Sequence, residues 1–176
     1  MTATDVVADW RADIFEALKA ADIRQVGYVP DAGHTRLIEL CEADPAIRAV
    51  KLTSEEEGIG LAAGAWLGGQ RCALLLQSSG VGNCINMLSL VKSCRFPLLM
   101  LVTMRGEWAE FNPWQVPMGR QTQAALELMD VLVYRAERED EVGSTVAAAL
   151  DIAFNGSLAA AVLLAQRLIG AKRWVK

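Results

Sequence analysis

The chain has 176 residues, of which 53% are hydrophobic and 22% charged, and its formal net charge at pH 7 is −4. This length fits one domain, and this apolar content can build a buried core, which excludes an intrinsically disordered chain. The acidic balance excludes the basic surface that nucleic acids need, and no apolar run is long enough to span a bilayer. We therefore expect a single domain over residues 1–176, with its core at about 10–165.

The first predicted helix covers residues 5–21, where Val6, Trp10, Ile14 and Leu18 recur at helical spacing. Strand and helix patterns then alternate along the chain. The predicted strands are 25–29, 46–52, 72–76, 97–103, 131–134 and 159–164. The predicted later helices are 34–43, 54–68, 81–94, 119–128 and 139–155, with a long loop over 104–118 and a basic tail over 165–176.

The predicted strands are continuous apolar runs without polar alternation, which is typical of strands buried on both faces of a parallel sheet. Together with the strict alternation of strand and helix, this predicts an α/β fold of three layers, α/β/α, with a six-stranded, mainly parallel sheet. In such folds ligands bind beyond the carboxyl ends of the strands. The loops after the first four strands are therefore where a site is expected.

The four cysteines, Cys41, Cys72, Cys84 and Cys94, show no CxxC spacing, and His34 is the one histidine. This pattern predicts no Cys/His metal site. We expect the cysteines to be small buried hydrophobes in a reducing compartment. The N-terminal segment is amphipathic and acidic, unlike a signal peptide, so we expect a cytoplasmic protein without a membrane or nucleic-acid partner.

Three acidic residues, Glu55, Glu56 and Glu57, open the helix predicted over 54–68. Ser54 and Glu57 fit the S-x-x-E capping box, and the helix dipole favours acidic side chains in a first turn. Capping would explain these carboxylates without any function, so both interpretations stay open here.

The same helix contains Gly58, Gly60 and Gly64. Each glycine inside a helix costs about 1 kcal/mol relative to alanine. A helix tolerates this where another backbone or a ligand must come close. We therefore expect one face of this helix to be pressed against a neighbour, at the end where the carboxylates lie.

The run QSSGVGN at residues 77–83 joins a predicted strand to a predicted helix. Glycines at such a turn allow backbone N–H groups to approach a ligand. The run lacks the P-loop pattern and the third glycine of the dinucleotide fingerprint. It fits an ordinary tight turn as well as a binding turn.

The long loop carries Arg105, Trp108, Trp114 and Gln115, and Arg120 follows it. Loops of this length in compact domains are usually functional or disordered, and the tryptophans argue against disorder. Arginines can bind a carboxylate, phosphonate or sulfonate through two hydrogen bonds. Packing against a partner subunit would explain the loop equally well.

Asp31 and His34 follow the first predicted strand. A histidine titrates near neutral pH and can serve in acid–base chemistry, or it can cap the following helix. The position beyond the carboxyl end of a strand favours the functional interpretation.

Four runs in this order resemble the pyrimidine-binding (Pyr) domain of thiamine diphosphate enzymes, in particular of sulfopyruvate and phosphonopyruvate decarboxylases. They are EEEGIGLAAG at 55–64, LQSSGVGN at 76–83, MRGE at 104–107 and PMGR at 117–120. The resemblance covers about residues 10–165 and implies the fold described above.

The resemblance implies that one glutamate hydrogen-bonds N1′ of the aminopyrimidine ring and activates the cofactor. The family places this residue nine positions before the glycine of the small-residue stretch, and counting back from Gly64 gives Glu55, with Glu56 as the neighbouring alternative. The implied cofactor-binding residues are Glu55, Gly80, Val81, Gly82 and Asn83.

Thiamine diphosphate enzymes also need a PP domain, which holds Mg²⁺ and the diphosphate through a GDG motif. This sequence has no GDG motif. The resemblance therefore implies a separate PP-domain β subunit that carries the metal ligands and shares the cofactor, and it implies a homodimer of Pyr domains.

The implied activity is decarboxylation of a small 2-oxo acid, such as 3-sulfopyruvate or 3-phosphonopyruvate, to an aldehyde and CO₂. Arg105, Arg120 and Gln115 are the candidates for substrate binding, and Asp31 and His34 are candidate catalytic residues beside Glu55. The alternatives are a related enzyme with another 2-oxo acid or carboligation, and a non-catalytic Pyr-fold binding module.

Overall fold

The computed structural model describes residues 9–171 and contains one six-stranded sheet in the order β2-β1-β3-β4-β6-β5. All five strand pairings are parallel, so the sheet is wholly rather than mainly parallel. The strands are β1 (Ile23–Tyr28), β2 (Arg48–Lys51), β3 (Arg71–Gln77), β4 (Leu98–Thr103), β5 (Leu132–Ala136) and β6 (Ala159–Leu164). The predicted α/β class and three-layer arrangement are confirmed.

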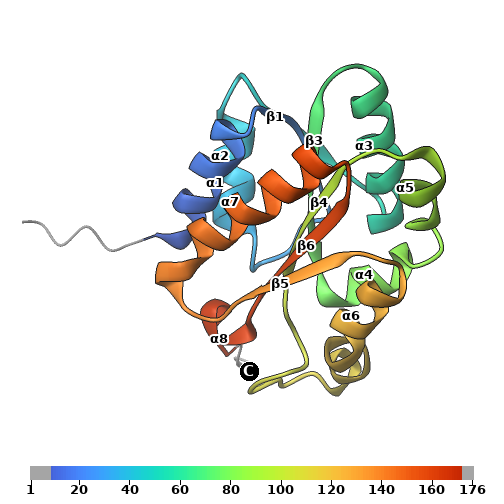
Figure 1. Cartoon of the computed structure of the whole chain (residues 1–176). Helices are drawn as coiled ribbons and strands as arrows, with labels where there is room; N and C mark the ends of the chain where they lie inside the picture. Colours follow the sequence, from blue (N-terminus) through green and yellow to red (C-terminus); the bar gives the residue numbers. More distant parts are fainter. Residues whose placement is uncertain (1–8, 172–176) are drawn as a thin grey trace, which may run out of the picture.

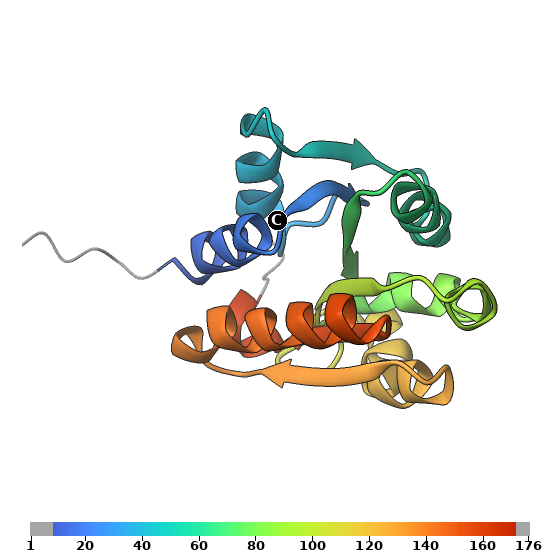
Figure 2. The ribbon, with the colours of Figure 1, turned by 45° about the horizontal axis from the view of Figure 1, so that its top comes forward.

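Helices cover both faces of this sheet (Figure 1). One face carries α1 (Trp10–Ala20), α2 (Thr35–Ala43) and α7 (Glu139–Gly156), whose apolar side chains form one core cluster with the sheet. The other face carries α3 (Glu55–Leu67), α4 (Ser78–Cys84), α5 (Ser89–Cys94) and α6 (Val116–Leu128) around a second cluster. In the tilted view of Figure 2, α1 and α2 lie together on one side and α3 to α6 on the other.

The burial of the strands follows their apolar content. Every residue of β4 and β6 is buried, and so are the five inner residues of β3. The edge strands β2 and β5 are only partly buried and carry charged residues such as Arg48 and Arg135. Within residues 9–171, no helix combines the length and apolar character needed to cross a membrane.

Several predicted boundaries differ from the structure. The helix expected over 81–94 is two helices, and α4 begins directly after β3. Helix α6 begins three residues before the predicted 119, after a short 3₁₀ helix η1 (Pro113–Gln115), so the loop after β4 is shorter than expected. Proline is tolerated in a first helical turn, so Pro117 does not prevent a helix from beginning at Val116.

The two chain ends also differ from the predictions. The first helix begins at Trp10, where the Asp9 carboxylate accepts a hydrogen bond from the Arg11 N–H (3.1 Å), and its predicted first turn lies outside the described residues. The basic tail begins with a short helix, α8 (Gln166–Ile169). Among the cysteines, Cys94 is exposed rather than buried.

The glycines of α3 do not share one environment. A Cβ atom on Gly58 would lie 2.9 Å from Leu74 Cδ2 and 3.0 Å from Leu52 Cδ1, so this position is closely packed. Gly60 and Gly64 are exposed, and a Cβ on either would meet no atom within 4 Å. The expected close contact is therefore present at Gly58. No described residue packs against Gly60 or Gly64, so a contact of this exposed side of α3 with a partner subunit stays a prediction.

We expect Gly60→Ala and Gly64→Ala each to raise the free energy of unfolding of the chain by roughly 0.5–1 kcal/mol, because alanine restricts the unfolded chain without a steric conflict in the helix. Urea unfolding followed by circular dichroism measures this. Gly58→Ala is the matched control and should be destabilising, since its Cβ displaces two core leucines. Equal effects at all three positions would contradict this description.

Candidate functional site

A cleft of about 640 Å³ lies where α3, α4 and α6 meet, beyond the carboxyl ends of β2 and β3. We call it the Glu55 cleft. Its lining combines a polar part from α3 and α4 with an apolar part from η1 and α6. The lining residues are Glu55, Ser79, Gly80, Gly82, Asn83, Pro113, Trp114, Pro117 and Met118. The structure thus brings four of the five residues expected to contact a cofactor into one place.

The close approach of α3 to α4 depends on Gly80. A Cβ atom there would overlap the carboxyl group of Glu55. The Glu55 carboxylate lies across this glycine and accepts a hydrogen bond from Asn83 Nδ2 (2.9 Å). Gly82 faces Met118, whose Sδ would be 3.3 Å from an added Cβ. Gly80 and Gly82 of α4 therefore leave room for a side chain of α3 and a side chain of α6, respectively.

The three glutamates of α3 have separate environments. Glu55 lines the cleft, whereas the Glu56 carboxylate accepts a hydrogen bond from the Ser54 hydroxyl. Glu57 accepts from the Thr53 N–H (2.9 Å), and the Ser54 side chain caps no backbone group. The capping box proposed from the sequence is therefore absent at this described helix end, and Glu55 is the glutamate of the three that reaches the cleft.

The run at residues 77–83 is not a turn, because all but its first residue belong to α4. Val81 is fully buried in the second core cluster, so its side chain does not line the Glu55 cleft. Of the two glycines of this run, Gly80 is buried beneath the Glu55 side chain and Gly82 is exposed.

Asp31 is held in a hydrogen-bond network that reaches the cleft. Its carboxylate accepts hydrogen bonds from Thr103 Oγ1 (2.6 Å), Gln77 Nε2 (2.7 Å) and the Gly33 N–H (3.2 Å). The side-chain carbonyl of Gln77 accepts in turn from Ser79 Oγ (2.9 Å) and Gln115 Nε2 (3.0 Å). Asp31 and Gln115 are thus joined through Gln77, next to Ser79 of the cleft lining.

His34 is fully buried, so it does not reach the cleft. Its Nε2 lies 3.2 Å from the Leu76 carbonyl and 3.1 Å from the Leu101 carbonyl, which identifies Nε2 as the protonated nitrogen. Burial lowers the pKa of this imidazole, so the neutral form is favoured. The structure corrects the prediction of an acid–base role: His34 ties β3 to β4, and it forms no side-chain cap to α2.

Arg105 is buried and paired with Glu110 rather than free to bind a substrate. Its Nε and Nη2 donate to the two Glu110 oxygens at 2.7 and 2.6 Å, and both side chains are less than a tenth exposed. The Arg105 guanidinium and further donors from Gly106, Asn112 and Gln166 lower the pKa of Glu110 to about 2. The sequence-based assignment of Arg105 to a substrate anion is therefore not supported.

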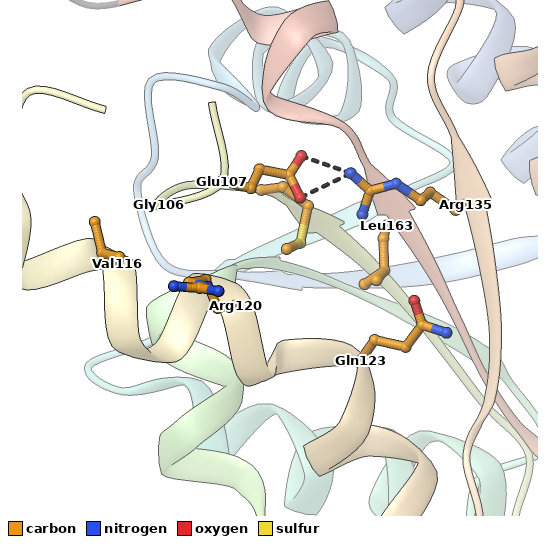
Figure 3. A pocket seen from close by; sticks show the side chains of 9 residues that line it. Gly106, Glu107, Val116, Arg120, Gln123, Arg135 and Leu163 are labelled. Carbon is orange, nitrogen blue, oxygen red and sulfur yellow. Dashed lines mark hydrogen bonds and ion pairs between the residues drawn. The ribbon is translucent and has the colours of Figure 1, made fainter. Parts of the chain in front are cut away.

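Arg120 faces a different cleft of about 600 Å³, which we call the Arg120 cleft (Figure 3). The first turn of α6 separates the two, because Pro117 and Met118 line the Glu55 cleft while Val116 and Arg120 line the other. The structure therefore does not bring Arg120 and Glu55 together, contrary to the expectation of a shared substrate site.

Sequence reasoning missed two parts of this region. The apolar wall of the Glu55 cleft contains Trp114, which is 82% exposed, together with two prolines and Met118. Their grouping in one stretch rich in proline and tryptophan was a signal for it. Glu110 gave no signal, since an isolated acidic residue in a loop looks solvated. Within residues 9–171, no group of three or more His, Cys, Asp or Glu side chains could hold a metal ion.

Comparison with known proteins shows the family of the chain. Residues 9–126 match the family model described as "Thiamine pyrophosphate enzyme, N-terminal TPP binding domain". The chain is 38% identical over 152 residues to the sulfopyruvate decarboxylase subunit alpha of Methanothermobacter thermautotrophicus, covering 86% of this chain and 92% of the relative. It is 38% identical over 122 residues to the phosphonopyruvate decarboxylase of Streptomyces viridochromogenes, covering 68% of this chain and 31% of the relative.

A solved structure shares the fold. The 2-oxoglutarate:ferredoxin oxidoreductase from Magnetococcus marinus, solved with 2-oxoglutarate, coenzyme A and succinyl-CoA bound, superposes with a TM-score of 0.71. The match covers 91% of this chain and 29% of that chain, at 14% sequence identity. At this identity the likeness establishes the architecture alone.

We expect Gly80→Ala to lower the free energy of unfolding by roughly 1–3 kcal/mol, because the new Cβ forces the Glu55 side chain away from α4. In a Glu55→Ala background the same substitution should have a much smaller effect. A double-mutant cycle by urea unfolding measures the coupling. Additive effects of the two substitutions would show that Glu55 does not lie over this glycine.

We expect Glu110→Gln to lower stability at pH 7 by about 3 kcal/mol, because it leaves the buried Arg105 without its counter-charge. Since the folded pKa of Glu110 is depressed to about 2, its stabilising effect is present above its unfolded pKa and is lost as pH falls toward 2. The difference in the free energy of unfolding between the wild type and Glu110→Gln should therefore become smaller as the pH falls from about 4.5 to 2. Glu39→Gln, in an exposed pair with Arg36, is the control and should change stability little at any pH.

Proposed function

Because the chain belongs to the thiamine pyrophosphate (thiamine diphosphate) enzymes, as an N-terminal TPP-binding domain, we propose that it is the Pyr subunit of a two-subunit 2-oxo acid decarboxylase. The two longest matches are to relatives named sulfopyruvate decarboxylase subunit alpha, at 34–38% identity. In both, the match covers nearly the whole length of the relative. The phosphonopyruvate decarboxylases match over a shorter part.

The observation that carries this proposal is the place of Glu55. Its carboxyl group lies at the polar end of a cleft whose opposite wall is apolar and includes the indole of Trp114. An aminopyrimidine is a flat ring with apolar faces and a polar edge, so these residues fit it. Asn83 holds the Glu55 carboxylate by one hydrogen bond and leaves its other oxygen free to meet a ring nitrogen.

When bound, thiamine diphosphate supplies the electron sink that allows a 2-oxo acid to lose CO₂. The role of Glu55 is to share a proton with N1′ of the pyrimidine ring, which requires a carboxyl group rather than an amide. Gly80 allows this carboxyl group to lie against α4, and Asn83 orients it. The apolar residues of the same cleft exclude water from the contact.

The proposal includes a PP-domain β subunit that carries the Mg²⁺ ligands and the diphosphate site. The words "subunit alpha" in the relatives' names support it. The exposed Trp114 at the rim of the Glu55 cleft is a surface that such a partner would cover. We also propose that Pyr domains pair as homodimers and that the protein is cytoplasmic, which its four free cysteines support.

We propose 3-sulfopyruvate or 3-phosphonopyruvate as the substrate, on the names of the relatives. No arginine or lysine is among the described residues that line the Glu55 cleft. Since Arg105 is held by Glu110 and Arg120 faces the other cleft, we assign the second anionic group of the substrate to the partner subunit. Gln115 and Asp31 then act as positioning residues through Gln77.

The test is decarboxylation of 3-sulfopyruvate and 3-phosphonopyruvate by the chain with its PP-domain partner, thiamine diphosphate and Mg²⁺. We expect turnover by the pair and none by either subunit alone. Glu55→Gln should lower kcat by about 100-fold or more, since it removes the proton-sharing group. Glu56→Gln and Glu57→Gln are matched controls on the same helix turn and should keep most of the activity.

Two further readouts separate the possible failures. Calorimetry should show that the Glu55→Gln complex still binds thiamine diphosphate, so that its lost turnover reflects chemistry. A formed complex without turnover on either substrate, but active on another 2-oxo acid or in carboligation, would overturn the substrate assignment only. Full activity of Glu55→Gln would overturn the assigned role of Glu55.

A further inference from the structure

The Arg120 cleft is lined by groups that the proposed function does not use. It lies beyond the carboxyl ends of β4, β5 and β6, with Arg120 of α6 and Arg135 of β5 on opposite sides (Figure 3). Met104 and Leu163, both almost fully buried, form an apolar floor between them. A cavity with an apolar floor and an arginine on each of two opposite sides is built like a small-molecule site.

Arg120 is the uncommitted cation of this cleft. Its side chain is exposed, and within residues 9–171 it makes no hydrogen bond or ion pair. Arg105, by contrast, is buried and held by two hydrogen bonds to Glu110. A guanidinium without a protein partner, at the wall of a cavity, is available for a carboxylate or sulfonate.

Arg135 is held in place by hydrogen bonds from two of its three guanidinium nitrogens. Its Nη2 donates to both oxygens of Glu107 at 2.7 Å, and its Nε donates to Glu137 at 3.0 Å. Its Nη1 has no hydrogen-bond partner in the described part of the chain. The two glutamates therefore fix the plane of the guanidinium while one edge stays open, which lowers the entropy that a ligand must overcome on binding.

We propose that the Arg120 cleft binds a small organic acid with an anionic group at each end, one paired with Arg120 and the other with Nη1 of Arg135. Two guanidinium groups on opposite walls favour such a ligand over an acid with one anionic end. The Glu107 carboxylate keeps the net charge of the cleft low, which disfavours polyanions such as nucleotides.

This site is independent of the proposed function. The first turn of α6 lies between it and Glu55, so a ligand here does not contact the activating carboxylate. The inference therefore stands or falls on binding by the chain itself, without cofactor, Mg²⁺ or partner subunit.

The test is isothermal titration of the full chain at low ionic strength with succinate and with butyrate, which has the same carbon chain but one carboxylate. We expect saturable binding of succinate and binding of butyrate that is at least about tenfold weaker, because one charge-assisted contact is missing. Arg120→Gln should weaken succinate binding about tenfold or more, and Arg120→Lys should restore part of it. Arg135→Gln should weaken it as well.

Two control variants make the result specific. Arg36→Gln removes an exposed arginine from α2, on the opposite face of the sheet, and should leave succinate binding unchanged. Glu55→Gln should also leave it unchanged, since Glu55 lines the other cleft. Thermal unfolding checks that each variant is folded. Lack of saturation at millimolar succinate, equal binding by wild type and Arg120→Gln, or an equal loss in Arg36→Gln would each overturn the proposal.

Discussion

The buried carboxylate of Glu110 holds the chain between β4 and α6 in one conformation, and both clefts depend on that conformation. It accepts hydrogen bonds from the Arg105 guanidinium, from the N–H groups of Gly106 and Asn112 and from the Gln166 side chain. A buried charge with this many donors has no alternative partner of equal quality, so the segment has little freedom. It fixes where η1 and α6 begin, and therefore where the walls of both clefts lie.

Two glycines complete this arrangement. Gly106 adopts φ +79°, and an added Cβ would overlap the backbone at Gln115, so the chain can fold back on itself only with glycine there. An added Cβ on Gly119 would overlap the Arg105 carbonyl, which brings the first turn of α6 against the loop. The Arg105–Glu110 ion pair and these two close backbone contacts together hold the connection between β4 and α6 in a fixed conformation.

The sequence predicted the architecture because the strands of the sheet centre are uniformly apolar and the connecting helices are regularly spaced. It also predicted the Glu55 cleft in part, since acidic and glycine-rich runs after neighbouring strands converge at one sheet edge. It could not predict the arginine environments. Whether Arg105 is free depends on Glu110, a residue that no local pattern distinguishes from a solvated one. The burial of His34 could not be predicted for the same reason, because its Nε2 contacts the carbonyl groups of two strands that are distant in the sequence.

The strand order has a consequence for synthesis of the chain on the ribosome. β4 pairs with β3 on one side and with β6 on the other, although β5 precedes β6 in the sequence. While β6 is still inside the ribosome, the fully apolar strand LLMLVT keeps one hydrogen-bonding edge open. A nascent or truncated chain that ends before residue 159 therefore exposes an aggregation-prone edge, and co-translational folding of this layer must wait for the last strand.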